Sequence, residues 1–188
     1  MERNPDAVLD EYLVVLAQGG SRAAFARLAG RWMPRLRRHA QRLLFSPERA
    51  GDAVQEAWLN IASGLRRLDD PARFPAWAFA ITSRKCIDAI RRRSRDHRLA
   101  AEATAVTAVA GAFDPVAGAD TRLDLSAAIG RLPVDQRLLV SLFYGEDLSV
   151  HDIAAALSLP PGTVKSRLHA ARRALKIHLE GGHHDPCR

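Results

Sequence analysis

The chain has 188 residues and carries 28 Lys and Arg against 21 Asp and Glu, a formal net charge of +7. This length fits one or two small domains, and the positive charge points to a polyanionic partner. Cys86 and Cys187 make no recognisable disulfide or metal set, and no phosphate-binding loop or Ser/His/Asp set occurs, so the sequence favours neither an enzyme nor a cofactor protein. Without a leader pattern or an apolar run that could cross a bilayer, we expect a cytoplasmic protein with no membrane insertion.

The first hundred residues are rich in Ala, Leu and Arg, which are good helix formers. A short helix is predicted over about 6–17, and Gly19-Gly20 breaks it. Ser21 can cap a second helix, whose inward face carries apolar residues at helical spacing and in which Pro34 predicts a kink or a boundary. The basic face of this second helix is one of three arginine-rich clusters in the chain, which suggests contact along an extended nucleic-acid path or with several acidic surfaces.

A third helix should open at Ser46-Pro47 and carry a core stripe that includes Val54, Trp58 and Ile61. Its opposite face holds residues at i, i+3, i+4 and i+7, namely Asp52, Gln55, Glu56 and Leu59. A leucine between acids on an exposed face indicates a protein-docking patch, although an ordinary solvated face with one stray leucine gives the same pattern.

Residues 69–77 form a turn that leads into a fourth helix, which starts near Pro75 and runs into the second basic cluster. Phe74 and Trp77 stand beside this cluster, and aromatic rings next to cations are what single-stranded or flipped bases require. The alternative is that both rings are core residues that anchor the start of the helix. Cys86, within the apolar pattern of the same helix, is expected to be a small core residue.

Residues 99–121 contain no Lys or Arg and are rich in Ala, Val, Thr and Gly, which predicts a flexible linker over 98–121. It separates an amino-terminal helical domain (8–97) from a carboxyl-terminal one (122–180), and residues 181–188 are predicted to be a disordered tail. The tail residues His183, His184 and Cys187 could bind a metal only adventitiously, so no metal site is expected. The predicted fold is therefore all-α, with two small helical domains joined by a flexible linker.

The carboxyl-terminal domain ends in a helix-turn-helix pattern. Ser149 with Asp152 gives a capping motif for a short helix, and Pro161 suits the first position of a longer one. The longer helix has an apolar face and a basic face with no acid before Glu180, which favours DNA binding over a merely solvated basic face.

These segments together resemble bacterial sigma factors of the extracytoplasmic-function (ECF) group within the sigma-70 family. The resemblance rests on residues 23–28, 52–59 and 74–93, on Leu132-Pro133, and on residues 162–168 with the helix-turn-helix. It covers nearly the whole chain in the family's order. It implies a promoter-specificity subunit whose partners are core RNA polymerase, promoter DNA and an anti-sigma factor, with no catalytic residue, cofactor or small-molecule substrate.

The resemblance also implies a role for each group of site residues. The patch Asp52, Gln55, Glu56 and Leu59 is expected to bind polymerase. The −10 element is expected to meet Phe74, Trp77, Arg84, Lys85, Asp88, Arg91 and Arg92. The −35 element is expected to meet Gly162, Thr163, Lys165, Ser166, Arg167, His169, Arg172 and Arg173.

Within the last set, the resemblance implies that Lys165, Ser166 and His169 stand at the positions that read −35 bases in this family. The arginines Arg167, Arg172 and Arg173 are better placed for phosphate contacts. Arg84 stands where the family commonly has Asn, and Ala170 where Arg is common, so the base preference at both places stays open. Two rival readings remain. One is an ordinary helix-turn-helix repressor or response-regulator output domain, a class that usually dimerises, and the other is a sigma mimic that sequesters an anti-sigma factor without binding DNA.

Overall fold

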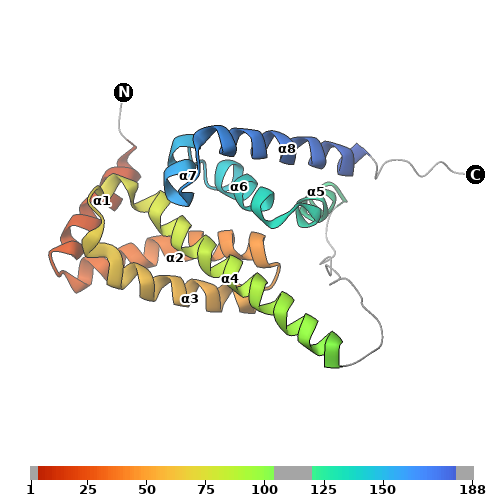
Figure 1. Ribbon diagram of the computed structural model, residues 1–188. Helices are drawn as coiled ribbons and strands as arrows, with labels where there is room; N and C mark the ends of the chain where they lie inside the picture. The colour runs from red at the N-terminus through yellow and green to blue at the C-terminus, as the bar shows by residue number, and fades with distance from the viewer. Residues whose placement is uncertain (1–3, 104–119, 181–188) are drawn as a thin grey trace, which may run out of the picture.

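The structure is a computed structural model that describes the backbone of residues 4–103 and 120–180 (Figure 1). Its first part contains α1 (Pro5–Gln18), α2 (Arg22–Leu44), α3 (Pro47–Gly64) and α4 (Phe74–Ala103), with two 3₁₀ turns, Leu65–Arg67 and Pro71–Arg73, between α3 and α4. Its second part contains α5 (Asp120–Arg131), α6 (Val134–Gly145), α7 (Val150–Leu157) and α8 (Pro161–Glu180). No strand occurs in these two ranges, so the prediction of an all-α fold in two helical parts is confirmed.

Local sequence signals place most of the helix starts. The side chains of Ser21, Ser46 and Ser149 each accept a hydrogen bond from a backbone N–H of the first turn that follows. Pro34 lies inside α2 and does not end it. Helix α4 continues through Ala103, six residues into the segment predicted to be linker.

The amino-terminal half, α1–α4, has a core built around aromatic rings. Trp32 of α2 meets Phe74 edge-on at a centroid distance of 5.2 Å and Phe79 at 5.7 Å, and all three side chains are buried. Phe25 and Trp58 form another edge-to-face pair between α2 and α3 at 5.8 Å. Such pairs stabilise a core beyond the area they bury, and they fix α2, α3 and the start of α4 against one another.

The carboxyl-terminal half, α5–α8, has an aliphatic core. Helix α8 packs across α5, α6 and α7 and lies along the outer side of this half (Figure 1). Leu139 and Leu142 of α6 and Ile153 of α7 are fully buried, as is Val164 of α8. These side chains hold α7 and α8 in their helix-turn-helix arrangement.

The two halves contact one another directly, through α2 against α6 and through α4 against α7 and α6. The buried imidazole of His39 in α2 is hydrogen-bonded to Ser141 of α6 at 3.0 Å and to Ser83 of α4 at 2.9 Å. Beside it, Arg42 donates to Glu146 at 2.6 Å. We call these five residues the seam, because they join the halves through polar contacts between segments far apart in the sequence.

The charge states in the seam follow from burial. Burial, with the nearby guanidinium of Arg42, lowers the pKa of His39 to about 3, so the ring is neutral at physiological pH. A neutral imidazole donates from one nitrogen and accepts at the other, which suits a position between two hydroxyl groups. Burial also raises the pKa of Glu146, although the hydrogen bond from Arg42 opposes this shift.

Candidate polymerase and nucleic-acid interface

The outer face of α3 holds the residues predicted to dock on polymerase. Asp52, Gln55 and Leu59 are exposed, and Leu59 keeps 73% of its surface accessible. Ala53, Ala57 and Trp58 on the opposite side are buried in the core. The predicted spacing therefore does put these three side chains on one solvent-facing surface.

Glu56, the fourth member of this patch, is tied to α4. Its carboxylate lies 3.2 Å from Lys85 Nζ and 3.6 Å from a guanidinium nitrogen of Arg92. The hydrogen bond from Lys85 is the main cause that lowers the pKa of Glu56, with Arg92 adding to it. One predicted polymerase contact and two predicted −10 contacts thus form a single cluster of charges.

The two aromatic residues at the start of α4 differ from one another in exposure. Phe74 is completely buried against Trp32, so as folded here its ring is not available to stack on a base, contrary to its expected place among the −10 contacts. Trp77 is partly exposed, and its ring lies so close to Gly64 that a Cβ there would be 3.0 Å from it. Phe74 therefore anchors the helix start, which is the alternative that the sequence had left open.

The remaining predicted −10 residues follow one another along α4. Arg84, Asp88, Arg91 and Arg92 are exposed, and Lys85 is half-buried. Several of them line one cavity of about 710 Å³. Its lining residues are Glu56, Lys85, Asp88, Ile90, Arg91, Arg92, Ser94 and Arg95. Arg95 also lines this cavity, although it was not among the residues predicted to meet the −10 element. Its spacing of four residues from Arg91 was the signal that could have included it.

The helix-turn-helix forms as the sequence predicts. Ser149 Oγ accepts from the N–H of Asp152 at 3.1 Å. Helix α7 ends when Ser158 enters the left-handed region at φ 55°, and a three-residue turn leads to Pro161 at the start of α8. The turn is closed from the other side by the N–H of Thr163, which donates to the carbonyl of Pro160 at 2.9 Å.

Helix α8 separates its faces clearly. Val164, Leu168 and Ala171 are buried, and the predicted base-reading residues are all exposed: Lys165, Ser166 and His169. Gly162, Arg172 and Arg173 are exposed as well. Arg167 is only half-exposed and lies 3.6 Å from Asp135 of α6, so it also ties α8 to its neighbour.

Neither a metal nor a thiol chemistry is evident in the described part of the chain. No group of three or more His, Cys, Asp or Glu side chains that could hold a metal ion occurs in residues 4–96 and 125–179. Cys86 is buried as predicted, and burial raises its pKa to about 12, which leaves the thiol protonated and unreactive. The tail residues His183, His184 and Cys187 lie outside the described residues. Within the described helices, none combines the length and the apolar character needed to cross a membrane.

Comparison with known proteins agrees with this geometry. Residues 28–96 match the family Sigma-70 region 2, and residues 122–175 match Sigma-70, region 4. The chain is 32% identical over 166 residues to the ECF RNA polymerase sigma factor SigM of Mycobacterium tuberculosis (strain ATCC 25618 / H37Rv), a match that covers 88% of this chain and 82% of SigM. It is 29% identical over 170 residues to the ECF RNA polymerase sigma factor SigW of Bacillus subtilis (strain 168), covering 85% of this chain and 91% of SigW.

Two solved structures share the fold. One is the sigma factor RpoE in complex with the anti-sigma factor NepR from Bartonella quintana, with a TM-score of 0.66 and 26% identity, covering 83% of this chain and 96% of that one. The other is CnrH in complex with the cytosolic domain of CnrY, with a TM-score of 0.68 and 26% identity, covering 92% and 98%.

The regions matched define a sigma factor of the sigma-70 family, a class of proteins that regulate transcription. Within that class, the relatives show that the chain belongs to the ECF RNA polymerase sigma factors. Its function is therefore promoter-directed initiation of transcription, with core RNA polymerase and promoter DNA as partners.

Proposed function

We propose that residues 8–97 bind core polymerase and the −10 element, that residues 122–180 bind the −35 element, and that the protein acts in the cytoplasm without catalysing a reaction itself. The observation that carries this division is the presence of three surfaces in one chain: the outer face of α3, the basic flank of α4 and the exposed face of α8. A repressor would not need the polymerase-docking face of α3. A sigma mimic would not need the two DNA-binding surfaces on α4 and α8.

The outer face of α3 supplies the polymerase contact. Leu59 offers an exposed apolar anchor, and Asp52 and Gln55 surround it with polar groups, which is the arrangement of an interface with an apolar centre and a polar rim. Buried apolar anchors carry much of the energy of such interfaces. We expect Leu59→Ala to weaken binding to core polymerase about tenfold or more, a change of about 1.4 kcal/mol.

Co-elution and titration with core polymerase test this contact. Val15→Ala on α1 is the matched control, because Val15 is also an exposed aliphatic residue, with 52% of its surface accessible. Equal affinities for the Leu59→Ala and Val15→Ala proteins would remove the docking assignment from α3.

The basic flank of α4 supplies the −10 contact. Arg84, Arg91 and Arg92 can neutralise the phosphates of a displaced strand, and the partly exposed ring of Trp77 can stack on an unpaired base. Phe74 contributes indirectly, because its buried ring fixes the start of α4 to the core. Fluorescence anisotropy on a single-stranded −10 oligonucleotide should show weaker binding for Arg91→Ala, and unchanged binding would contradict the assignment.

The exposed face of α8 supplies the −35 contact. Lys165, Ser166 and His169 reach base edges, whereas Arg172 and Arg173 bind phosphates. Lys165→Ala should therefore change the preferred sequence, and Arg172→Ala should weaken binding to all sequences about equally. Selection from a randomised −35 library measures both outcomes. If both variants only lowered affinity alike, the split between base and phosphate contacts would be wrong.

An anti-sigma factor controls the protein under this proposal. The support is that both structural neighbours were solved with an anti-sigma factor or with the cytosolic domain of a partner. Affinity purification of the tagged chain from its own cells should recover a protein that blocks transcription when it is added back. Full activity of the cell-derived protein, with no inhibitor released by washing in high salt, would contradict this part.

A further inference from the structure

Five arginines form a row along one flank of α2, and none of the three surfaces assigned above includes it. They follow one another at intervals of three or four residues, a spacing that puts side chains on the same side of a helix: Arg27, Arg31, Arg35, Arg38 and Arg42. The row is about 22 Å long, since a helix rises about 1.5 Å per residue. No acidic residue occurs in α2. We call these five residues the arginine row.

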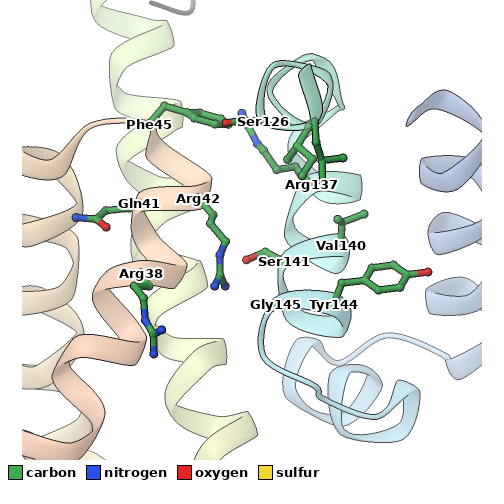
Figure 2. Close-up of a pocket in the computed structure, with 12 residues that line it drawn as sticks. Arg38, Gln41, Arg42, Phe45, Ser126, Arg137, Val140, Ser141, Tyr144 and Gly145 are labelled. Atoms are coloured by element: carbon green, nitrogen blue, oxygen red, sulfur yellow. The ribbon is translucent and has the colours of Figure 1, made fainter. Parts of the chain in front are cut away.

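The carboxyl-terminal part of the arginine row surrounds a carboxylate from the other half of the molecule. Arg42 donates to Glu146 at 2.6 Å, and Arg35 lies 4.0 Å from the second carboxylate oxygen. Figure 2 shows Arg42 on the side of α2 that faces α6, near Ser141, with Arg38 one turn earlier in the same helix. Only 5% of the side-chain surface of Glu146 is accessible. Burial raises its pKa and the charges of Arg42, Arg35 and Arg38 oppose the rise, so all three act on one carboxylate.

The surrounding structure positions two of these cations. The guanidinium of Arg35 lies 4.3 Å from the ring centre of Trp32, and a cation over an aromatic ring is attracted to it. Arg42 passes close to Gly145, the last residue of α6, where a Cβ would force the guanidinium to move. The carboxyl-terminal end of a helix carries partial negative charge, which favours a cation there. Both guanidinium groups are therefore held where they can meet an anion.

The amino-terminal part of the arginine row is paired within its own half. Arg31 donates to Asp10 at 2.7 Å and to Asp6 at 2.9 Å, and both acids belong to α1. Arg27 and Arg38 are exposed. Among the described residues, three carboxylates thus face five guanidinium groups. Ion pairs within the molecule therefore do not account for the whole row.

The chemistry of the arginine row fits nucleic-acid phosphates better than the surface of another protein. A guanidinium can bind two phosphate oxygens through parallel hydrogen bonds. A protein interface has an apolar core, but Met33 is the only large apolar residue exposed on α2. Met33 is two residues from Arg31 and from Arg35, so it lies on the opposite face of the helix. Promoter DNA, which is already a partner of this chain, supplies such phosphates.

We propose that the arginine row binds the phosphate backbone of DNA, and that Glu146 masks the carboxyl-terminal part of the row while the two halves touch. A phosphate and Glu146 compete for the same guanidinium groups, those of Arg35 and Arg42. By linkage, DNA bound there favours separation of the halves as strongly as their contact opposes DNA binding. Such backbone contacts position a protein on DNA without reading its sequence. This inference goes beyond the proposed function, which assigns no role to α2.

Titration of the full chain with DNA at several salt concentrations tests the row. The probe is a short labelled duplex of mixed sequence without the −10 and −35 elements, and fluorescence anisotropy gives its affinity. The slope of log K against log salt concentration counts the phosphates that the protein neutralises, at about 0.9 per phosphate in B-DNA. Differences in this slope between variants therefore report phosphate contacts and leave promoter recognition aside.

Two neighbouring arginines provide a matched pair of variants. Arg38→Gln should lower the slope by about 0.9 and weaken binding severalfold at low salt. Arg37 is also exposed, but its side chain leaves α2 about 100° around the helix axis from Arg38, outside the row. Arg37→Gln should therefore keep the wild-type slope. Equal slopes for the two variants would overturn the assignment of the row.

A change at Glu146 tests the masking. Glu146→Gln can still accept a hydrogen bond from Arg42 but carries no charge, so the slope should become steeper by about 1–2 and binding at low salt severalfold tighter. Asp147→Asn is the control, because it removes an exposed acid one residue later and Asn tolerates the φ of 54° found there. The same gain in both variants, or no gain in Glu146→Gln, would refute the masking.

Competition separates DNA from an acidic protein as the partner of the arginine row. At equal concentrations of negative charge, polyglutamate should displace the labelled duplex far less well than unlabelled duplex does, because DNA also releases its condensed counterions on binding. Arg38→Gln should leave the effect of polyglutamate unchanged. Equally efficient displacement by polyglutamate and by DNA, lost in Arg38→Gln, would assign the row to an acidic protein surface and contradict the proposal.

Discussion

The two halves of this sigma factor differ in how each is stabilised. In the amino-terminal half, Trp32, Phe74 and Phe79 form a buried group of rings that joins α2 to α4. In the carboxyl-terminal half the large buried side chains are aliphatic, and Tyr144 stays more than half exposed. The first half thus has an aromatic core of its own, whereas the second is smaller, has an aliphatic core, and packs against α2 and α4 of the first.

The residues proposed to contact DNA also differ between the two halves. On α4, Lys85 and Arg92 share a carboxylate with the docking face of α3, so part of their charge is already neutralised. On α8, Lys165 and His169 project from a face whose opposite side is buried. The comparison teaches that the proposed −10 surface is coupled through Glu56 to the proposed polymerase surface of the same half, whereas the proposed −35 residues Lys165 and His169 lie on a helix face of their own.

The largest expected effect is on the aromatic core. Trp32→Ala removes a fully buried ring that contacts two others, and we expect it to lower the free energy of unfolding by about 3–5 kcal/mol. Denaturation in guanidinium measures this, with Met33→Ala at a half-exposed neighbouring position as the control. A loss below about 0.5 kcal/mol, within the range of a surface substitution, would show that the ring group does not hold this half together.

The aliphatic core should give a smaller and more local effect. Ile153→Ala leaves a cavity under α7, and we expect a loss of about 2–4 kcal/mol. Hydrogen exchange should become faster in α5–α8 and stay slow in α2 and α3. Equal acceleration in both halves would mean that they unfold as one unit, and the distinction between them would fail.

The next expected effect is a loss of stability in acid that arises at the seam. The pKa of His39 is about 3 in the folded protein and 6.5 in its ordinary state, so the folded protein binds fewer protons between these values. The contribution of His39 to the free energy of unfolding is therefore largest above pH 6.5. It falls by about 1.4 kcal/mol for each pH unit as the pH drops from 6.5 toward 3.

Thermal unfolding at several pH values measures this slope. His39→Asn keeps a polar side chain but cannot titrate. The slope of stability against pH between pH 6 and pH 4 should therefore be smaller in the variant, by the amount that corresponds to one proton. The same slope in the wild-type protein and in the variant would show that His39 is not the group responsible.

The smallest expected effect concerns the pair that joins α3 to α4. Glu56→Gln removes an ion pair that is partly exposed, so stability should change by no more than about 1 kcal/mol. Release of Lys85 and Arg92 should nevertheless strengthen binding to a single-stranded −10 oligonucleotide at low salt. Weaker binding by the variant would show that Glu56 positions these cations and does not restrain them.

Much of this fold could be predicted from the sequence because its signals are local. Ser149, Asp152 and Pro161 mark the helix-turn-helix through caps and turn chemistry that need no tertiary information. For Phe74 the sequence allowed two interpretations, a base-stacking ring or a core residue. The structure shows a core residue, because Phe74 packs against Trp32, which lies 42 residues earlier in the chain.

The seam had no such local signal. His39 and Ser141 lie 102 residues apart, and nothing in the sequence around either one indicates the other. Arg137 appears in the sequence as an ordinary helix residue, but it is buried in the structure, with its guanidinium 5.0 Å from the ring centre of Phe45. Contacts between the two halves depend on tertiary packing, which helical periodicity does not encode.

Run-off transcription with core RNA polymerase, the purified chain and a library of genomic fragments that includes its own upstream region tests the account most directly. We expect specific start sites that appear only when the chain is added, preceded by two shared elements at a fixed spacing. The Leu59→Ala and Arg91→Ala proteins should reduce these transcripts. Tight binding to duplex DNA with no transcript, or release of another sigma factor from its inhibitor with no transcript, would contradict the central claim that this chain directs initiation itself.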